Sequence, residues 1–224
     1  MSNIYQHNFD NCMKMRLSNS DYWDLFLCYD CEDAPNPDII LTGSCLLVNI
    51  DIDDDDSYSG DTVYNLVDWT DHGAILSLED VKWAEKWAWA PDCVERNGKY
   101  YFYYPVERAK IGVAVSDSPT GPFVDKLGKP LIDNTGQIEH IGKEPIDPSV
   151  LIEDNQAYMY FGCREPKVVK LNDDMMSLRE DVEELKINGI ENDKEHFGGF
   201  YGEAPWVFKR NDTFYLLYSN GWGK

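Results

Sequence analysis

The chain has 224 residues, which is enough for one domain with its own hydrophobic core. It carries 20 lysine and arginine residues against 41 aspartate and glutamate residues, giving a net charge of −21. Such an acidic surface repels phosphate backbones and anionic lipids, so the composition argues against nucleic acid and membranes as partners.

Nothing in the sequence predicts export or membrane insertion. The opening residues, Met1 to His7, lack a basic stretch followed by an apolar one, and no apolar run is long enough to cross a bilayer. Of the six cysteines, Cys28 and Cys31 have CxxC spacing, but no second CxxC or pair of histidines completes a zinc site. We therefore expect reduced thiols and a cytoplasmic protein.

Residues 1–35 form a separate N-terminal segment in the predicted organisation. This segment contains an aromatic and aliphatic run from Tyr22 to Tyr29, which is typical of a strand. We expect the run to supply a strand that the following domain lacks, or to pack beneath that domain. The domain itself is predicted to span residues 36–224.

A repeat runs through residues 36–224. Four segments each begin near a proline, continue as a short apolar strand, turn tightly, and return as an aromatic or aliphatic strand. The prolines are Pro37, Pro91, Pro148 and Pro205, at spacings of 54, 57 and 57 residues. The turns contain Thr42-Gly43, Asn97-Gly98, Asp154-Asn155 and Asn211-Asp212, residue types that close two-residue hairpins. This period predicts the blades of a β-propeller; the alternative is an antiparallel sandwich with coincidental spacing.

The fourth repeat is short. Only the length of a hairpin follows Pro205, so we expect an all-β, incomplete propeller of about three and a half blades. Open blades leave unpaired strand edges, and such edges favour pairing with another chain. The sequence therefore predicts self-association, with a homodimer covering the open edges.

Several motifs resemble glycoside hydrolase family 43, in the order and at the spacing of that family. The segment that begins Trp89-Ala-Pro-Asp resembles its second-blade motif, Ile146-Asp-Pro-Ser its third and Tyr201-Gly-Glu-Ala-Pro its fourth. Residues 67–73 (VDWTDHG) and 111–123 (IGVAVSDSPTGPF) are also typical of the family. The resemblance covers roughly residues 34–224.

The resemblance implies a five-bladed propeller that hydrolyses β-xylosides, α-L-arabinofuranosides or arabinans with inversion. It also implies three carboxyl groups: a first-blade Asp as general base, a third-blade Asp that orients and tunes the acid, and a fourth-blade Glu as general acid. By motif, Glu203 matches the acid and Asp147 the tuning Asp. From the residues alone, Asp147 is equally a turn residue before proline, and Glu203 equally a salt-bridge partner.

The first repeat departs from the family pattern. Where the family has an Asp before proline, this chain has Asn36, whose amide cannot accept a proton from water. We expect Asn36 to contact substrate instead. Asp38 lies two residues further on, on the same face of a strand, and is the candidate base. The acidic loop 51–56 offers other carboxylates, and the sequence does not choose among them.

That acidic loop also resembles the start of a calcium-binding loop. Acidic residues alternate at 51, 53 and 55, but the sixth position is Asp56 rather than Gly and the twelfth is Thr62 rather than Glu. A solvated acidic loop is the favoured interpretation, with Ca2+ as the alternative. We expect no other metal or cofactor.

Two further residues are candidate sugar contacts. Trp89 precedes a strand on the side expected to face the central funnel, where an indole ring can stack on a sugar face; its alternative role is core packing between blades. Arg164 follows the second strand of the third repeat. It can hold a substrate hydroxyl or the Asp147 carboxylate, or it can neutralise surface acids such as Glu165.

Two functions of different classes follow from these features. The first is an inverting glycosidase that releases arabinose or xylose from plant-cell-wall oligosaccharides. The second is a non-catalytic carbohydrate-binding or scaffold propeller that has lost the base and the last blade, which Asn36 and the short fourth repeat favour. A carboxylate across the funnel from Glu203, at about 6.5–9.5 Å, would distinguish the first from the second.

Overall fold

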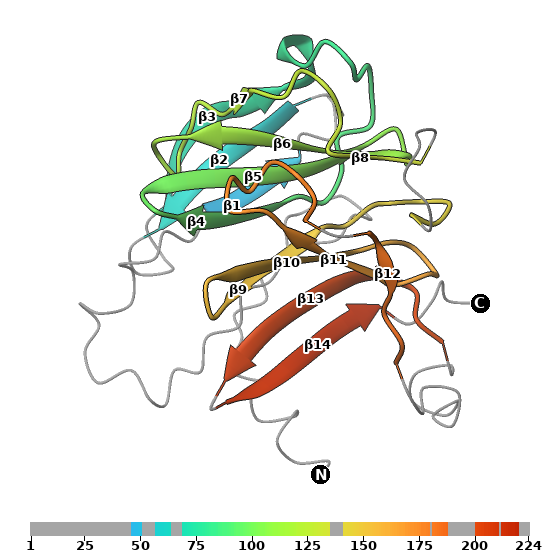
Figure 1. Ribbon diagram of the computed structural model, residues 1–224. Coiled ribbons are helices and arrows are strands. Elements are labelled where there is room, and N and C mark those ends of the chain that lie inside the picture. Colours follow the sequence, from blue (N-terminus) through green and yellow to red (C-terminus); the bar gives the residue numbers. More distant parts are fainter. Residues whose placement is uncertain are drawn as a thin grey trace.

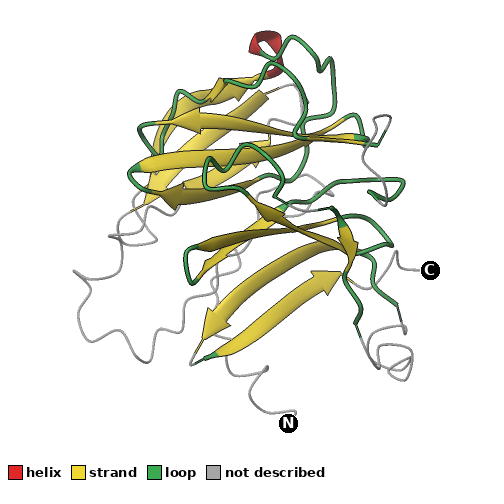
Figure 2. Ribbon diagram, viewed as in Figure 1, coloured by secondary structure: helices red, strands yellow, loops and turns green. Residues whose placement is uncertain are grey.

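The computed structural model describes residues 46–50, 57–63, 69–134, 141–179, 181–187, 200–210 and 212–219. Within these ranges the chain forms antiparallel strands in four sheets, with one 3-10 turn at Leu78–Asp80 (Figure 2). The predicted all-β class is therefore confirmed. The same ranges contain no helix long and apolar enough to cross a membrane. The N-terminal segment 1–35 lies outside them, as do the proline and turn of the first repeat.

The sheets follow one another in chain order. The first contains β1 (Leu46–Ile50), β2 (Ser57–Val63) and β3 (Trp69–Ser77). The second contains β4 (Asp92–Arg96), β5 (Lys99–Val106), β6 (Lys110–Ser116) and β7 (Val124–Asp125), and β8 (Ile132–Asp133) also pairs with β6. The third contains β9 (Ser149–Glu153), β10 (Gln156–Phe161), β11 (Lys167–Leu171) and β12 (Glu183–Glu184). The fourth is the hairpin of β13 (Glu203–Arg210) and β14 (Thr213–Ser219).

Two-residue turns close the hairpins of the second and third sheets. Asn97 and Gly98 have φ values of 55° and 75°, and Asp154 and Asn155 have 47° and 65°. Positive φ at both central positions is the signature of a type I′ turn, whose twist matches that of the strands it joins. The flanking strands pair in antiparallel register directly across each turn. The predicted hairpins are confirmed here, and also for β13 and β14.

The second sheet is buried on both faces, because the first and third sheets pack against it (Figure 1). Side chains alternate across a strand, so β5 directs Tyr101 and Tyr103 toward the third sheet and Phe102 and Tyr104 toward the first. Tyr103, Phe102 and Tyr104 are fully buried. Burial on both faces explains why β5 reads as an unbroken aromatic run instead of alternating with polar residues.

Gly112 lets β6 approach one of these aromatic rings. It pairs directly with Tyr104 across the β5–β6 ladder. A Cβ atom added to Gly112 would stand 2.3 Å from the Tyr104 ring carbon Cζ. Only glycine therefore allows the buried ring to lie against β6.

Equivalent hydrogen bonds, from a backbone N–H to a side-chain oxygen, tie the second sheet to the third and the third to the fourth. Asp92 Oδ2 accepts a hydrogen bond from the Val150 N–H at 2.6 Å, and Ser149 Oγ accepts one from the Val207 N–H at 3.3 Å. Both acceptors directly follow the proline of their repeat, and the two valines are 57 residues apart. The repeat seen in the sequence therefore recurs in the contacts between sheets.

Arg96 forms a second tie between the second and third sheets. Its side chain is 7% exposed, and its Nη2 donates to the Asn155 carbonyl oxygen at 2.9 Å and to Asp173 Oδ1 at 3.2 Å. Nearby, the Tyr103 hydroxyl donates to the Met175 carbonyl oxygen at 2.8 Å. These bonds satisfy polar groups at the edge of the apolar core, and they fix how the two sheets pack.

Candidate active site

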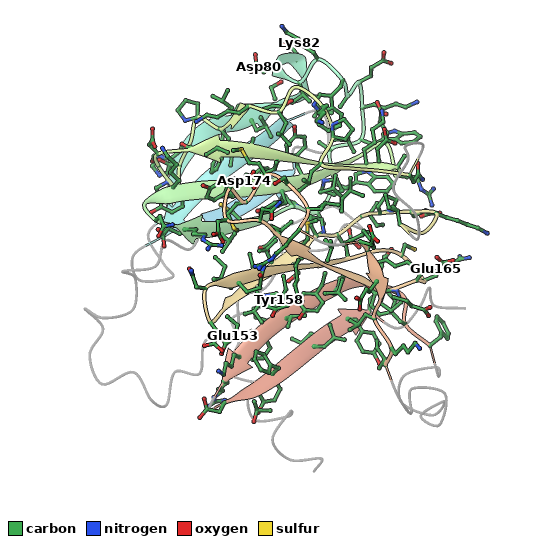
Figure 3. The ribbon with its side chains drawn as sticks, in the orientation of Figure 1. Asp80, Lys82, Glu153, Tyr158, Glu165 and Asp174 are labelled. Atoms are coloured by element: carbon green, nitrogen blue, oxygen red, sulfur yellow. The ribbon has the colours of Figure 1, made fainter. Side chains whose placement is uncertain are left out.

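The candidate site lies at one end of the third sheet, where the chain enters β9 and leaves β10. Asp147 precedes β9, and Arg164 follows β10. Figure 3 places Glu165, the neighbour of Arg164, at the opposite end of this hairpin from Glu153, the last residue of β9. Glu203 begins β13 and meets the third sheet at the same end as Asp147.

Asp147 is held against the peptide group that follows Glu203. Its Oδ2 accepts a hydrogen bond from the Ala204 N–H at 3.0 Å. Asp147 and Ala204 both have a φ of 54°, outside the extended region. The pairing of β13 with β14 shifts register between Glu203 and Trp206, so the strand is irregular directly after Glu203. Bulges and positive φ values of this kind concentrate at functional sites.

The Asp147 and Glu203 carboxyl groups both have raised pKa values. Burial and the nearby Glu203 charge raise the pKa of Asp147 from its ordinary 3.8 to about 7, against the opposing effect of the Ala204 N–H. Burial also raises the pKa of Glu203, and the Glu144 charge adds to this. Two neighbouring carboxyl groups do not ionise independently, so the pair retains a proton toward neutral pH. A carboxylic acid that keeps its proton is what general acid catalysis requires.

Two hydrogen bonds to backbone carbonyl oxygens attach the loop after β10 to the segment before Glu203. The Arg164 N–H donates to the Gly202 carbonyl oxygen at 2.5 Å, and the buried Tyr201 hydroxyl donates to the Gly162 carbonyl oxygen at 2.8 Å. The Arg164 side chain is exposed, and its charge lowers the pKa of Glu203. Arg164 thus contributes a positive charge beside the two carboxyl groups.

Cys163 is a buried neighbour of Glu203. Its N–H donates to the Glu144 carbonyl oxygen at 3.1 Å, and its thiol forms a hydrogen bond with Glu203 that lowers the pKa of that carboxyl group. Burial, together with the Glu203 and Glu144 charges, raises the pKa of the thiol to about 11. The thiol therefore stays neutral and donates to the Glu203 carboxylate.

Arg108 brings the second sheet into the site. It lies in the turn between β5 and β6, and its Nη2 donates to Glu144 Oε2 at 2.8 Å. Its guanidinium carbon lies 5.7 Å from the centroid of the Trp89 ring. Its charge also lowers the pKa of Glu203. Arg108 therefore links Trp89 and Glu144 to the carboxyl pair.

The structure brings four of the predicted site residues into one region, and their roles stay predictions. These are Glu203, Asp147, Arg164 and Trp89; Asn36 and Asp38 lie outside the described residues. The sequence analysis missed Arg108, Glu144 and Cys163. A signal for Arg108 existed, because it follows Pro91 by 17 residues much as Arg164 follows Pro148 by 16. No local pattern signals its pairing with Glu144, 36 residues away.

The described part of the chain contains no group of three or more histidine, cysteine, aspartate or glutamate side chains placed to hold a metal ion. The acidic loop 51–56 lies outside that part. Calcium binding by this loop therefore stays an alternative prediction from sequence.

Comparison with known proteins gives consistent matches. The sequence model of glycosyl hydrolases family 43 matches residues 33–222. A xylosidase/arabinosidase 43A from Humicola insolens is 35% identical over 196 residues, covering 68% of this chain and 56% of the relative. The structure of an α-L-arabinofuranosidase from Clostridium thermocellum is 34% identical with a TM-score of 0.64, covering 75% of this chain and 54% of that one. A family 43 enzyme from Xanthomonas citri, complexed with xylotriose, is 30% identical with a TM-score of 0.59, covering 74% and 58%.

The chain thus spans a little over half the length of these relatives. The family match covers most of the chain, and it includes the segments that carry Trp89, Asp147 and Glu203. The four antiparallel sheets agree with the all-β, propeller-type fold of the structures it resembles. On this evidence, the chain belongs to glycosyl hydrolases family 43.

Proposed function

We propose that the protein is an inverting glycosidase that releases arabinose or xylose from plant-cell-wall oligosaccharides, with Glu203 as the general acid. The observation that carries this proposal is the carboxyl pair. Asp147 is bonded to the peptide that follows Glu203, and both carboxyl groups have raised pKa values. The relatives named for xylosidase and arabinosidase activity support the substrate class.

In the proposed reaction, Glu203 acts in its protonated form. It donates its proton to the glycosidic oxygen as the bond between that oxygen and the anomeric carbon breaks. A water molecule attacks the anomeric carbon from the opposite face, and a carboxylate base accepts the proton that the water loses. The sugar leaves with inverted configuration, Glu203 is left ionised, and proton exchange with solvent restores both groups.

Asp147 acts in this proposal as a positioning residue. Its hydrogen bond to the Ala204 N–H holds the peptide that follows Glu203, and the Glu203 charge raises the pKa of Asp147 to about 7, so the pair keeps a proton toward neutral pH. Asp38 remains the candidate base, from outside the described residues. A retained proton is useful for catalysis but gives no advantage to a site that only binds sugar, so the pair favours the enzyme over the binding module.

The repeat also supports the proposed β-propeller architecture. Four antiparallel sheets follow one another in chain order, and the last three are joined by equivalent side-chain-to-backbone hydrogen bonds 57 residues apart, as consecutive blades of a propeller require. The homodimer predicted from open strand edges stays a prediction. Light scattering at micromolar concentration would test it, with a monomeric mass as the contrary result.

Nitrophenol release from nitrophenyl α-L-arabinofuranoside and β-xyloside tests the proposed activity. Wild-type protein should hydrolyse at least one of these, and Glu203→Gln should lose about 10²–10⁴-fold in kcat/KM, the usual contribution of an acid or base. Glu79→Gln is the matched control, because it makes the same change on an exposed carboxylate in the turn Leu78–Asp80. This control should keep wild-type activity and folding.

The leaving group separates a general acid from a residue needed only for folding or binding. Dinitrophenolate is a good leaving group that departs without protonation, so Glu203→Gln should hydrolyse the dinitrophenyl glycoside far better than it hydrolyses a xylo-oligosaccharide. Equal losses on both substrates would reject the acid role. Full activity of Glu203→Gln on the oligosaccharide would reject it as well.

A further inference from the structure

A strip of alternating cationic and aromatic side chains leads away from the carboxyl pair. We call it the aromatic strip; it consists of Lys86, Trp87, Trp89 and Arg108. The Trp87 and Trp89 rings stack with centroids 6.1 Å apart and an interplanar angle of 18°. Lys86 Nζ lies 4.4 Å from the Trp87 centroid, and the Arg108 guanidinium carbon lies 5.7 Å from that of Trp89. The chemistry proposed above uses none of Lys86, Trp87 or their stacking.

The two ends of the aromatic strip differ in their surroundings. Arg108 donates a hydrogen bond to Glu144, and the Glu144 carbonyl oxygen accepts the N–H of Cys163, the neighbour of Glu203, so this end lies near the general acid. Trp87, toward the other end, is 38% exposed, which is high for so large an apolar side chain. The Arg108 side chain is itself 50% exposed, so the strip lies along the surface of the protein with one end near the acid.

The backbone at Trp87 is held in an unfavourable conformation. Its φ is 59°, in the left-handed region that bulky side chains rarely adopt. The neighbouring Ala88 is fully buried and the Trp89 N–H donates to the Pro105 carbonyl oxygen at 3.1 Å, so the segment is anchored on the core side. The exposed indole ring of Trp87 thus stands on a strained but anchored backbone. It is placed for contact with a ligand, since core packing does not need it there.

We infer that the aromatic strip binds the sugar unit on the leaving-group side of the scissile bond, in a neutral oligosaccharide. The inference rests on the proposed function, because a general acid stands on the side where the leaving group departs. The strip starts at that acid, so the next sugar unit would lie along it. This would make the protein prefer oligosaccharides to monosaccharide glycosides.

The chemistry of the aromatic strip fits a sugar ring. The apolar face of a pyranose or furanose can stack on the Trp87 indole, and Lys86 is exposed and flexible enough to be displaced from that ring. Arg108 has five N–H donors and donates one of them to Glu144 at 2.8 Å, so others can donate to sugar hydroxyl oxygens. Lys86 supplies a second donor at the outer end.

Titration calorimetry can test the inference by measuring sugar affinity in the Glu203→Gln variant, which should bind substrates without hydrolysing them. The probes are xylotriose and arabinotriose, compared with xylose and arabinose. The background protein should bind at least one trisaccharide more tightly than its monosaccharide. Adding Trp87→Ala should weaken trisaccharide binding by up to about tenfold, the effect of losing one aromatic stacking contact, and leave monosaccharide binding unchanged. Trp87→Phe should restore most of the loss.

The contrary outcomes are distinct from failure of the proposed function. An unchanged trisaccharide affinity in Trp87→Ala, or an equal loss for trisaccharide and monosaccharide, would overturn the strip as a subsite. Trp87→Gly accepts the φ of 59° without strain, so it should show the same selective loss with full thermal stability. Loss of hydrolysis in the wild type, with the selective binding kept, would reject the glycosidase and leave the sugar subsite standing.

Discussion

Asp92 and Asp147 occupy comparable places at two junctions between sheets. Each lies beside the proline that opens a repeat, and each accepts a backbone N–H from the following sheet, from Val150 at 2.6 Å and from Ala204 at 3.0 Å. Burial is the main cause of a raised pKa in both, to about 6 for Asp92 and about 7 for Asp147. Backbone N–H groups lower the pKa of both, but only for Asp147 does a neighbouring carboxyl group, Glu203, add to the upward shift.

The difference shows that a raised pKa does not by itself identify a catalytic group. Asp92 combines burial with backbone donors, which is the arrangement of a structural contact. Asp147 adds a second carboxyl group, Glu203, whose charge raises the pKa of Asp147, and acid catalysis can use such an interaction. We therefore expect changes at Asp147 to act mainly on activity and changes at Asp92 mainly on stability.

The largest expected contrast is in activity. Asp147→Asn keeps an oxygen that can accept the Ala204 N–H but removes the charge beside Glu203, so kcat/KM on nitrophenyl glycosides should fall at least about 100-fold with folding intact. Asp92→Asn is the matched control and should stay near wild type. Equal losses in both variants would remove the distinction between the two junctions.

A smaller contrast is expected in stability. Asp92→Ala leaves the Val150 N–H without its acceptor, and this should lower the free energy of unfolding by about 1–3 kcal/mol, measured by urea denaturation. Asp92→Asn keeps an oxygen acceptor and should retain most of the stability. An Asp92→Ala protein as stable as the wild type would show that water replaces this contact.

The pH dependence of unfolding sharpens the same test. The pKa of Asp92 is about 6 in the folded protein against an ordinary 3.8, so the folded state binds more protons between these values. The contribution of Asp92 to the free energy of unfolding should therefore fall as pH rises from 3.8 to about 6 and stay level above that. Asp92→Asn should lose this slope, while the wild type and Glu79→Gln keep it.

The sequence predicted the parts of the fold that depend on neighbouring residues. Asn97-Gly98 and Asp154-Asn155 close hairpins because each residue accepts positive φ, which is a local property that a sequence reveals. The contacts between sheets could not be predicted, because they join residues far apart in the chain. Arg108 meets Glu144 across 36 residues, and no residue pattern near either one signals the pair.

The site was predictable only in part for a related reason. Glu203 and Asp147 stand in motifs that recur with the repeat, whereas the third carboxyl group of the mechanism does not. Asn36 and Asp147 each directly precede the proline of their repeat. Asp38 and Asp92 each directly follow it. In the described repeats the position after proline makes the contact to the next sheet. Identical residue types beside the same proline thus have different tasks, and residue type alone does not identify the base.

The smallest expected effect concerns Cys163. Variants at this residue separate control of the pKa of Glu203 from control of its position. The thiol hydrogen bond stabilises the ionised form of Glu203, so Cys163→Ala should raise the pKa of that carboxyl group. Activity that needs protonated Glu203 is lost as pH rises through this pKa, so the basic limb of kcat/KM should move to higher pH. Cys163→Ser keeps a donor and should leave the limb near its wild-type position. The same shift in both variants would mean that packing around the buried side chain, not hydrogen bonding, sets the ionisation of Glu203.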